Sequence, residues 1–248
     1  MKAHAPNTPR PRELGNAPRA RRRAQRSRAV QGELFARTWG GPRRRAGRKR
    51  RAARELVAHR SRPALSGRCP VHVTLRLAEG LPSLRAPATY RALLAALAGG
   101  CERFGMRLVH WVALGNHMHL IVEARDRYAL SRGMQGLGVR LARALNRVWR
   151  RSGRVLADRY HARPLRSPRE VRNALGYVLR NARKHGLALV GADPCSSGPW
   201  FDGWLEAGRG DRAEVERPGW LRAARTWLLA HGWRRWGLLD IDGWPGGP

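Results

Sequence analysis

Leu114-Gly115-Asn116-His117-Met118-His119-Leu120-Ile121-Val122 places two histidines on either side of one methionine, directly after a Gly-Asn turn signal. In a β-strand, successive side chains point to opposite faces, so His117 and His119 share one face. Met118, Leu120 and Val122 then share the other face, where they can join a core. This stretch therefore predicts a turn followed by a strand with one apolar face and two imidazoles on the other.

Two imidazoles on one strand face can bind a divalent metal ion, with their second ring nitrogens held by other side chains. The alternative is that His117 and His119 are two surface histidines on an ordinary hairpin strand. A His-x-His pair alone favours that alternative, because short motifs occur often by chance. A second motif, about sixty residues later, is needed to favour a site.

The elements around this strand are predicted from periodicity. Residues 71–77 alternate apolar and polar side chains and predict a half-buried strand. Residues 90–104 have helical spacing, and residues 107–114 predict a strand that forms a hairpin with residues 117–123. Asp126 is a suitable N-cap for a long helix over residues 127–150.

Beyond that helix, residues 155–165 predict a strand with irregular ends. Ser167, Pro168 and Glu170 then form a strong helix-start signal, with a capping residue, a proline in the first turn and a capping-box acid. This helix is expected to end at Gly186. The order strand, helix, strand, strand, helix, strand, helix predicts an α+β fold of the ferredoxin-like type, with an antiparallel sheet and helices packed on one face.

Composition points to a polyanionic partner. The 248 residues carry a formal charge of +33 and a pI near 11.9, which favours nucleic acid. Residues 1–62 hold 20 Lys or Arg and 3 acids, a net +17. The sequence thus predicts a basic, largely disordered arm over residues 1–66, a folded domain over 67–190 and a Trp-rich extension over 191–248.

The sequence also bears on location. No apolar run is long enough for a transmembrane helix, and no secretory signal is recognised at the N-terminus. The cysteines Cys69, Cys101 and Cys195 are odd in number and widely spaced, which favours a reducing cytoplasm over a disulfide framework. We expect a cytoplasmic protein without a membrane partner.

The second motif is Tyr177-Val178-Leu179-Arg180-Asn181-Ala182-Arg183-Lys184-His185-Gly186. Tyr177 and Asn181 are four residues apart, which places them on one helix face. This motif is similar to the Tyr-x-x-x-Asn-Pro-x-x-x-Gly signature of the REP-associated tyrosine transposases. His117-Met118-His119 resembles the His-hydrophobic-His motif of the HUH nucleases, to which that group belongs. The resemblance covers roughly residues 68–190, and Ala182 departs from it where the group usually has proline.

The resemblance implies cleavage and rejoining of single-stranded DNA at hairpin-bearing ends through a 5′-phosphotyrosine intermediate. Tyr177 would be the nucleophile, and His117, His119 and Asn181 would be ligands of Mg²⁺ or Mn²⁺. We expect the nucleic-acid contacts to come from basic side chains of two helices and of the segments beside them, namely Arg140, Arg143, Arg147, Arg159, Arg180, Arg183 and Lys184. The relatives include both monomers and homodimers, so the oligomeric state stays open.

Three alternatives remain at this stage. Tyr160 is the rival nucleophile, although we expect it at a strand end away from Asn181. A non-catalytic protein that holds structured single-stranded DNA or RNA would also explain the charge. An RNA-binding protein with an RRM-like sheet would share the topology, but it would want exposed aromatic residues on the central strands, and residues 71–77 and 117–122 supply none.

Overall fold

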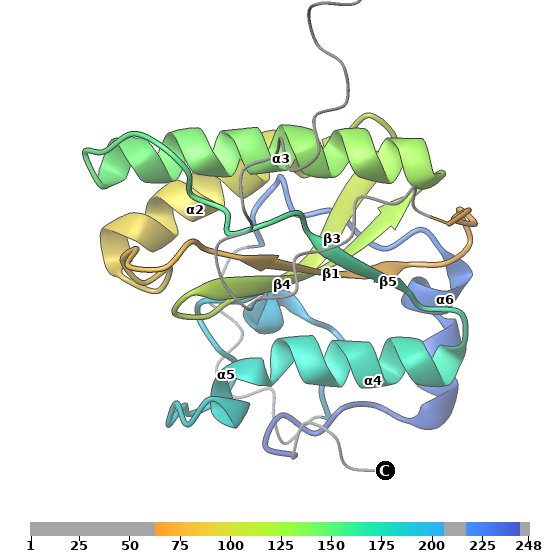
Figure 1. Cartoon of the computed structure of the whole chain (residues 1–248). Helices are drawn as coiled ribbons and strands as arrows, with labels where there is room; N and C mark the ends of the chain where they lie inside the picture. The colour runs from red at the N-terminus through yellow and green to blue at the C-terminus, as the bar shows by residue number, and fades with distance from the viewer. Residues whose placement is uncertain (1–62, 206–216, 244–248) are drawn as a thin grey trace, which may run out of the picture. The chain divides into compact units, whose positions relative to one another are not determined.

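A computed structural model describes residues 63–205 and 217–243. Residues 1–62 of the predicted basic arm, and Trp244, lie outside these ranges. Five antiparallel strands form one sheet in the order β2-β3-β4-β1-β5 (Figure 1). The strands are β1 (Val71–Arg76), β2 (Glu102–Arg103), β3 (Met106–Ala113), β4 (His117–Ala124) and β5 (His161–Pro164). The predicted α+β fold with an antiparallel sheet is confirmed.

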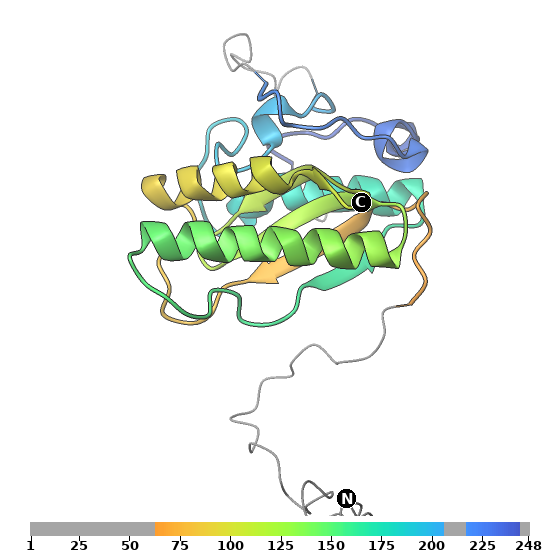
Figure 2. The same ribbon diagram turned by 90° about the horizontal axis from the view of Figure 1, so that it is seen from above.

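Two helices, α2 (Pro87–Gly100) and α3 (Arg127–Val148), lie side by side over one face of the sheet (Figures 1 and 2). The side chain of Asp126 accepts hydrogen bonds from the backbone N–H groups of Tyr128 and Ala129, so it caps α3 as predicted. The apolar stripe of α3 packs on the strand residues Met118, Leu120 and Val122. This layer forms the first hydrophobic core.

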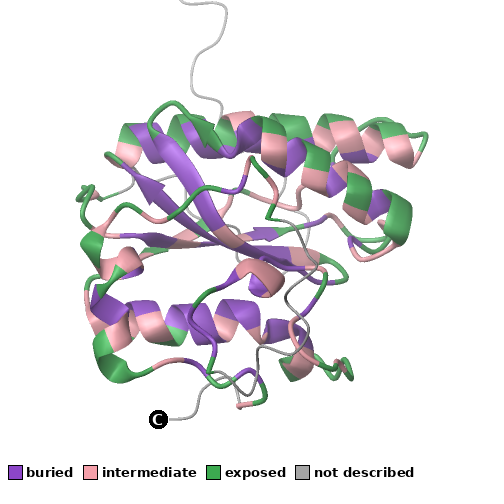
Figure 3. Cartoon of the chain, turned by 180° about the vertical axis from the view of Figure 1, so that it is seen from behind, coloured by how far each residue is buried: buried purple, intermediate pink, exposed green. Residues whose placement is uncertain are grey.

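The prediction that helices pack on one face only is wrong. Helix α4 (Pro168–Leu179) lies against the opposite face of the sheet (Figure 1). Its buried residues Val171, Leu175 and Val178 pack there with Ile121 of β4. The physical reason is that β3 and β4 also carry apolar residues on their second face, namely Val109, Val112 and Ile121, which must be removed from water. The purple, buried colour of both strands in Figure 3 shows this double burial.

A β-bulge makes the second core possible. The pairing of β3 with β4 shifts register between Leu108 and His110, so the alternation of side chains changes by one position. Trp111 therefore faces α2 and α3, whereas Val109 and Val112 face α4. One strand thus serves both cores.

The C-terminal region completes the second core. It contains η1 (Gly198–Trp200), α6 (Trp227–Ala230) and η4 (Gly232–Trp236). Trp204 and Trp233 are buried with Val112 and Leu179. The buried carboxylate of Glu123 on β4 accepts hydrogen bonds from the backbone N–H of Arg225, from the backbone N–H of Thr226 and from the Thr226 hydroxyl. These bonds attach the segment before α6 to the sheet.

Three elements depart from their predicted bounds. The helix expected over residues 90–104 is α2, which ends at Gly100, and Glu102–Arg103 form β2 instead. The strand expected over residues 155–165 is ordered as β5 only from His161 to Pro164. The helix expected to end at Gly186 breaks at Arg180, and a single turn, α5 (Asn181–Lys184), follows. Ser167 caps α4 by accepting a hydrogen bond from the Glu170 N–H. The strand β5 and the break between α4 and α5 both flank the candidate site.

Candidate active site on the second face of the sheet

The candidate site is built on the two central strands. In the antiparallel register of β1 and β4, Thr74 lies opposite His119 and Arg76 lies opposite His117. Residues opposite each other in a sheet point to the same face. The polar members of both strands therefore project together from the face that α4 covers, beside Ile121, and the other apolar members project into the first core.

His119 is held by two neighbours. Its Nδ1 lies 3.1 Å from Nε2 of His72 and 3.1 Å from Oγ1 of Thr74. Its other ring nitrogen, Nε2, is buried and has no hydrogen-bond partner among the described residues. His117 follows the same pattern, because its Nδ1 lies 2.8 Å from Oδ1 of Asn116. Both histidines are thus anchored through Nδ1, which leaves Nε2 for another partner.

Helix α4 brings Tyr177 onto these histidines. The centroid of the Tyr177 ring lies 5.2 Å from that of His119 and 5.7 Å from that of His72, both in edge-on geometry. The Lys184 ammonium lies 5.1 Å from the centre of the Tyr177 ring. The His185 ring, just after α5, lies 5.4 Å from that of His117. Tyr177 therefore contacts His119 of the strand motif, and His119 in turn contacts His117, with ring centroids 5.1 Å apart.

The environment keeps these imidazoles neutral. The pKa of His119 is lowered to about 3, mainly by burial and to a smaller extent by the nearby His72 and His117. Burial also lowers the pKa of His72 to about 4, with a smaller contribution from His161. Burial lowers the pKa of His117 as well. A neutral imidazole keeps a lone pair, so each ring can act as a metal ligand at neutral pH.

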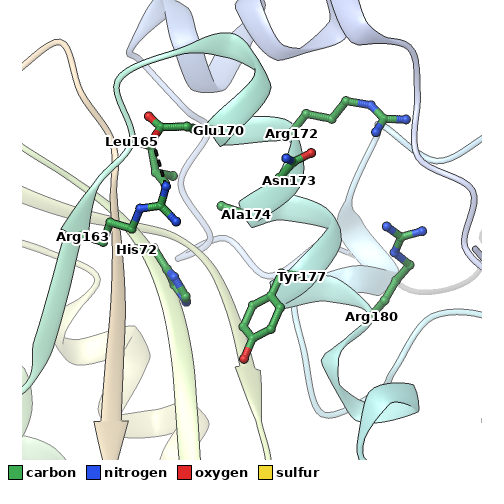
Figure 4. Close-up of a pocket in the computed structure, with 9 residues that line it drawn as sticks. All are labelled: His72, Arg163, Leu165, Glu170, Arg172, Asn173, Ala174, Tyr177 and Arg180. Atoms are coloured by element: carbon green, nitrogen blue, oxygen red, sulfur yellow. Dashed lines mark hydrogen bonds and ion pairs between the residues drawn. The ribbon is translucent and has the colours of Figure 1, made fainter. Parts of the chain in front are cut away.

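A cavity of about 350 Å³ opens beside Tyr177, between α4 and the strands β1 and β5. Figure 4 shows Tyr177 pointing from α4 towards the sheet, where His72 lies. Arg163 of β5 lines the cavity and is ion-paired with Glu170 at 2.9 Å. The cavity thus offers a basic side chain and an aromatic hydroxyl next to the histidine pair.

The donor set can be compared with the needs of a divalent ion. Within the described ranges, no three His, Cys, Asp or Glu side chains are grouped so that they could hold a metal ion by themselves. Asn181 at the start of α5 is fully buried, and neither its Oδ1 nor its Nδ2 has a hydrogen-bond partner in the described part of the chain. Two imidazole nitrogens and one amide oxygen fit Mg²⁺ or Mn²⁺ in donor type. Asn181 has no ring, so the ring-to-ring distances above do not place it relative to His117 and His119.

The predicted nucleic-acid contacts separate into three groups. Arg140, Arg143 and Arg147 lie on α3, across the sheet from Tyr177. Arg180 and Arg183 hold the C-terminal region, since Arg180 donates to the Asp240 carbonyl and Arg183 forms an ion pair with Asp242 at 2.9 Å. Lys184 and Arg159 are exposed, and Lys184 lies beside the site.

Sequence analysis missed His72, Thr74 and His185. A signal existed for the first two, because the alternation that buries Val71 and Val73 must place the residues at 72 and 74 on the other face. What was missing was the pairing of β1 with β4. His185 lies in an irregular segment after α5, where no periodic pattern predicts the position of a side chain.

Comparisons with known proteins add little. No protein-family model matches this sequence, and no curated protein matches it. The chain is similar to a solved structure described as a REP-associated tyrosine transposase bound to a REP hairpin, with a TM-score of 0.47 and 18% sequence identity, over 57% of this chain and 82% of that chain. A similarity of this size carries no information about function. No helix in the described ranges is both long and apolar enough to cross a membrane.

Proposed function

We propose that this protein is a metal-dependent endonuclease and strand transferase of the transposase type, which acts on single-stranded hairpin DNA through Tyr177. The observation that carries the proposal is the position of the Tyr177 ring, 5.2 Å from the ring of His119, whose Nε2 is buried and unpaired in the described part of the chain. A tyrosine beside a pair of neutral, anchored imidazoles suits attack on a phosphodiester.

The proposed reaction has two balanced steps. The Tyr177 oxygen attacks the phosphorus, the bond from phosphorus to the 3′ oxygen breaks, and the 5′ phosphate stays on the tyrosine. The phenol proton is released and the leaving 3′ oxygen gains a proton. In the second step a 3′ hydroxyl attacks the phosphotyrosine, releases the Tyr177 oxygen and restores a DNA strand. The covalent bond conserves the energy of the broken link, so no nucleotide cofactor is needed.

The chain's own residues would orient this chemistry. His72 and Thr74 hold the ring of His119 in one orientation, which fixes the direction in which its Nε2 points. His117, His119 and Asn181 would hold Mg²⁺ or Mn²⁺, which when bound supplies charge neutralisation at the phosphate. Lys184 places positive charge beside Tyr177, which favours the phosphate group.

Of the four tyrosines, Tyr177 is the best supported nucleophile. Tyr160 packs against the first core, under α2 and α3. The Tyr90 hydroxyl accepts a hydrogen bond from Trp111 Nε1 at 3.4 Å, and Tyr128 lies exposed in the first turn of α3. Tyr177 has ring contacts with two histidines, His72 and His119.

A second candidate function is non-catalytic binding of structured single-stranded DNA or RNA. The formal charge of +33 favours it. Under that function the buried, unpaired side-chain atoms of His119 and Asn181 have no use, because a binding surface does not need buried ligands without partners. The two functions differ in whether a covalent adduct forms.

The test incubates the full chain with labelled single-stranded hairpin DNA and Mg²⁺ or Mn²⁺, followed by denaturing gel electrophoresis. Wild type and Tyr160→Phe should form a protein–DNA adduct that requires metal, and Tyr177→Phe should form none. Tight binding without any adduct across metals and substrates would favour the binding protein. An adduct that persists in Tyr177→Phe and is lost in Tyr160→Phe would move the nucleophile to Tyr160.

A further inference from the structure

A second basic groove lies on the outer surface of α2 and α3, the layer in front of the sheet in Figure 2. Its cavity volume is about 640 Å³. It is lined by one exposed aromatic ring and by five exposed arginines from α3 and the β2–β3 turn, namely Phe104, Arg103, Arg132, Arg140, Arg143 and Arg147. None of these arginines forms an ion pair with an acidic side chain of the described ranges. Their charge is therefore available to a polyanion.

Phe104 has a backbone conformation that phenylalanine rarely adopts. Arg103 and Met106 pair across the β2–β3 hairpin, so Phe104 and Gly105 form a two-residue turn. Their φ angles are 56° and 75°. A turn with two positive φ angles favours Asn-Gly, because asparagine and glycine adopt this backbone at little cost. A bulky residue with positive φ is a strained outlier, and such outliers concentrate at functional sites.

The surrounding residues keep the Phe104 ring in the groove. The ring is 53% exposed. A Cβ atom on Gly136 of α3 would lie 3.3 Å from its Cε2, so the absence of a side chain there makes room for it. The Arg103 guanidinium lies 5.5 Å from the ring centre. On the α2 side, a Cβ on Gly99 would lie 3.0 Å from Nη1 of Arg140, so that arginine crosses the end of α2.

We infer that this groove binds unpaired nucleotides of single-stranded DNA, with one base stacked on Phe104 and the neighbouring phosphates held by the arginines. An exposed ring flanked by arginines is the arrangement that binds single strands, since every base has a face for stacking. A duplex would use the arginines but not the ring. The inference takes from the proposed function only that the polymer is DNA, and it does not depend on cleavage.

The groove and Tyr177 lie on opposite sides of the sheet, because α2 and α3 cover one face and α4 covers the other (Figure 1). A strand in the groove therefore cannot also lie at the histidine pair unless it passes around the sheet. The groove is thus a separate contact, which would anchor DNA away from the bond that is cleaved.

The test replaces Phe104 by asparagine in the full chain. Phe104→Asn relieves the strained turn, so its melting temperature should rise. Its affinity for an unstructured labelled oligonucleotide should nevertheless fall about tenfold, measured by fluorescence anisotropy. When the oligonucleotide carries 5-iodouracil, photo-crosslinking should attach it to the peptide of the wild-type protein that contains Phe104. Higher stability with unchanged affinity and no crosslink at this peptide would overturn the inference.

Charge variants separate the groove from the remaining basic surface. Arg132→Gln with Arg143→Gln should weaken binding and lower its salt dependence by about two ions. Arg125→Gln is the matched control, because this side chain is exposed and lies outside the groove. Equal losses in both would overturn the inference, as would a preference for anionic phosphatidylserine vesicles or for duplex DNA. Adduct formation by Tyr177 is measured separately. Absence of an adduct would therefore leave the binding result for the groove unchanged, and absence of binding in the groove would leave the adduct result unchanged.

Discussion

His72 of β1 and His119 of β4 contact each other across the sheet, with Nε2 of His72 3.1 Å from Nδ1 of His119. Their ring centroids are 5.1 Å apart. This contact, together with the Thr74 hydroxyl, fixes the orientation of the His119 ring and therefore of its Nε2. Such outer contacts commonly decide how well a histidine binds metal.

Replacing His72 by phenylalanine keeps a ring of similar volume but removes the nitrogen that contacts His119. We expect the Mn²⁺ concentration at half-maximal adduct formation to rise about 10- to 100-fold. His161→Phe is the control, because His161 lies on the neighbouring strand opposite Thr74 and is exposed. The metal titration of His161→Phe should match that of wild type. An unchanged titration in His72→Phe would mean that Thr74 alone orients His119.

His110 predicts how stability depends on pH. Burial lowers its pKa to about 4 from the ordinary 6.5, and its Nδ1 lies 3.1 Å from the Ser197 hydroxyl. Between these two values the unfolded chain binds a proton at this ring and the folded chain does not. The free energy of unfolding should therefore fall as the pH falls from about 6.5 to about 4, by up to about 1.4 kcal/mol per pH unit for this group.

Urea unfolding of wild type and His110→Gln across this pH range measures the effect. The variant should lose less stability on acidification than wild type does. A residual slope is expected in both proteins, because burial also lowers the pKa of His72 to about 4. Parallel curves for the two proteins would show that His110 is protonated equally in the folded and unfolded chain.

The sequence predicted β1, β3, β4 and part of β5, and both caps, because these depend on local patterns. It did not predict β2, which lies within residues 90–104, where a helix was expected. The alternation in β1 and the capping side chains of Asp126 and Ser167 act within a few residues. The second helical layer was not predicted, although Ile121 carried a signal. Together with Leu120 and Val122 it forms a continuous apolar run, which indicates a strand buried on both faces.

The site was predicted in part for a related reason. His117, His119 and Tyr177 could be found because their motifs are short and local. His72 contributes through the register of two strands that are 47 residues apart at this contact, and no single-strand pattern contains a register. The β-bulge of β3 near Val109 was not predicted for the same reason, because the face that Trp111 occupies depends on how β3 pairs with β4.

Gly133 predicts the cost of crowding α3 against β3. A Cβ atom at this position would lie 2.5 Å from Cβ of Met106, which is fully buried. Alanine favours a helix over glycine by about 1 kcal/mol, but the clash forces α3 away from the sheet. We expect Gly133→Ala to lower the free energy of unfolding by about 1–3 kcal/mol. Gly138→Ala is the control, because only the end of the flexible Leu156 side chain must move.

Chemical denaturation of the two variants gives the comparison. Gly138→Ala should stay within about 1 kcal/mol of wild type or gain stability. If Gly133→Ala were as stable as Gly138→Ala, the packing of α3 on Met106 would be looser than the described geometry.

Asn181 separates a metal ligand from a structural residue. Its buried amide has no hydrogen-bond partner in the described ranges, and an unsatisfied buried polar group costs about 1–3 kcal/mol. Leucine has a similar size and no polar atoms, so Asn181→Leu should match or exceed wild type in stability when metal is absent. Added Mn²⁺ should raise the melting temperature of wild type, since a ligand that binds only the folded state stabilises it. The variant should show a much smaller rise and should form little adduct.

Asn173→Leu is the matched control, because this residue is exposed on α4 one turn before Tyr177, and its metal response should be that of wild type. If Asn181→Leu lost stability without metal yet kept the full Mn²⁺ response, Asn181 would support the fold and the third ligand would lie elsewhere.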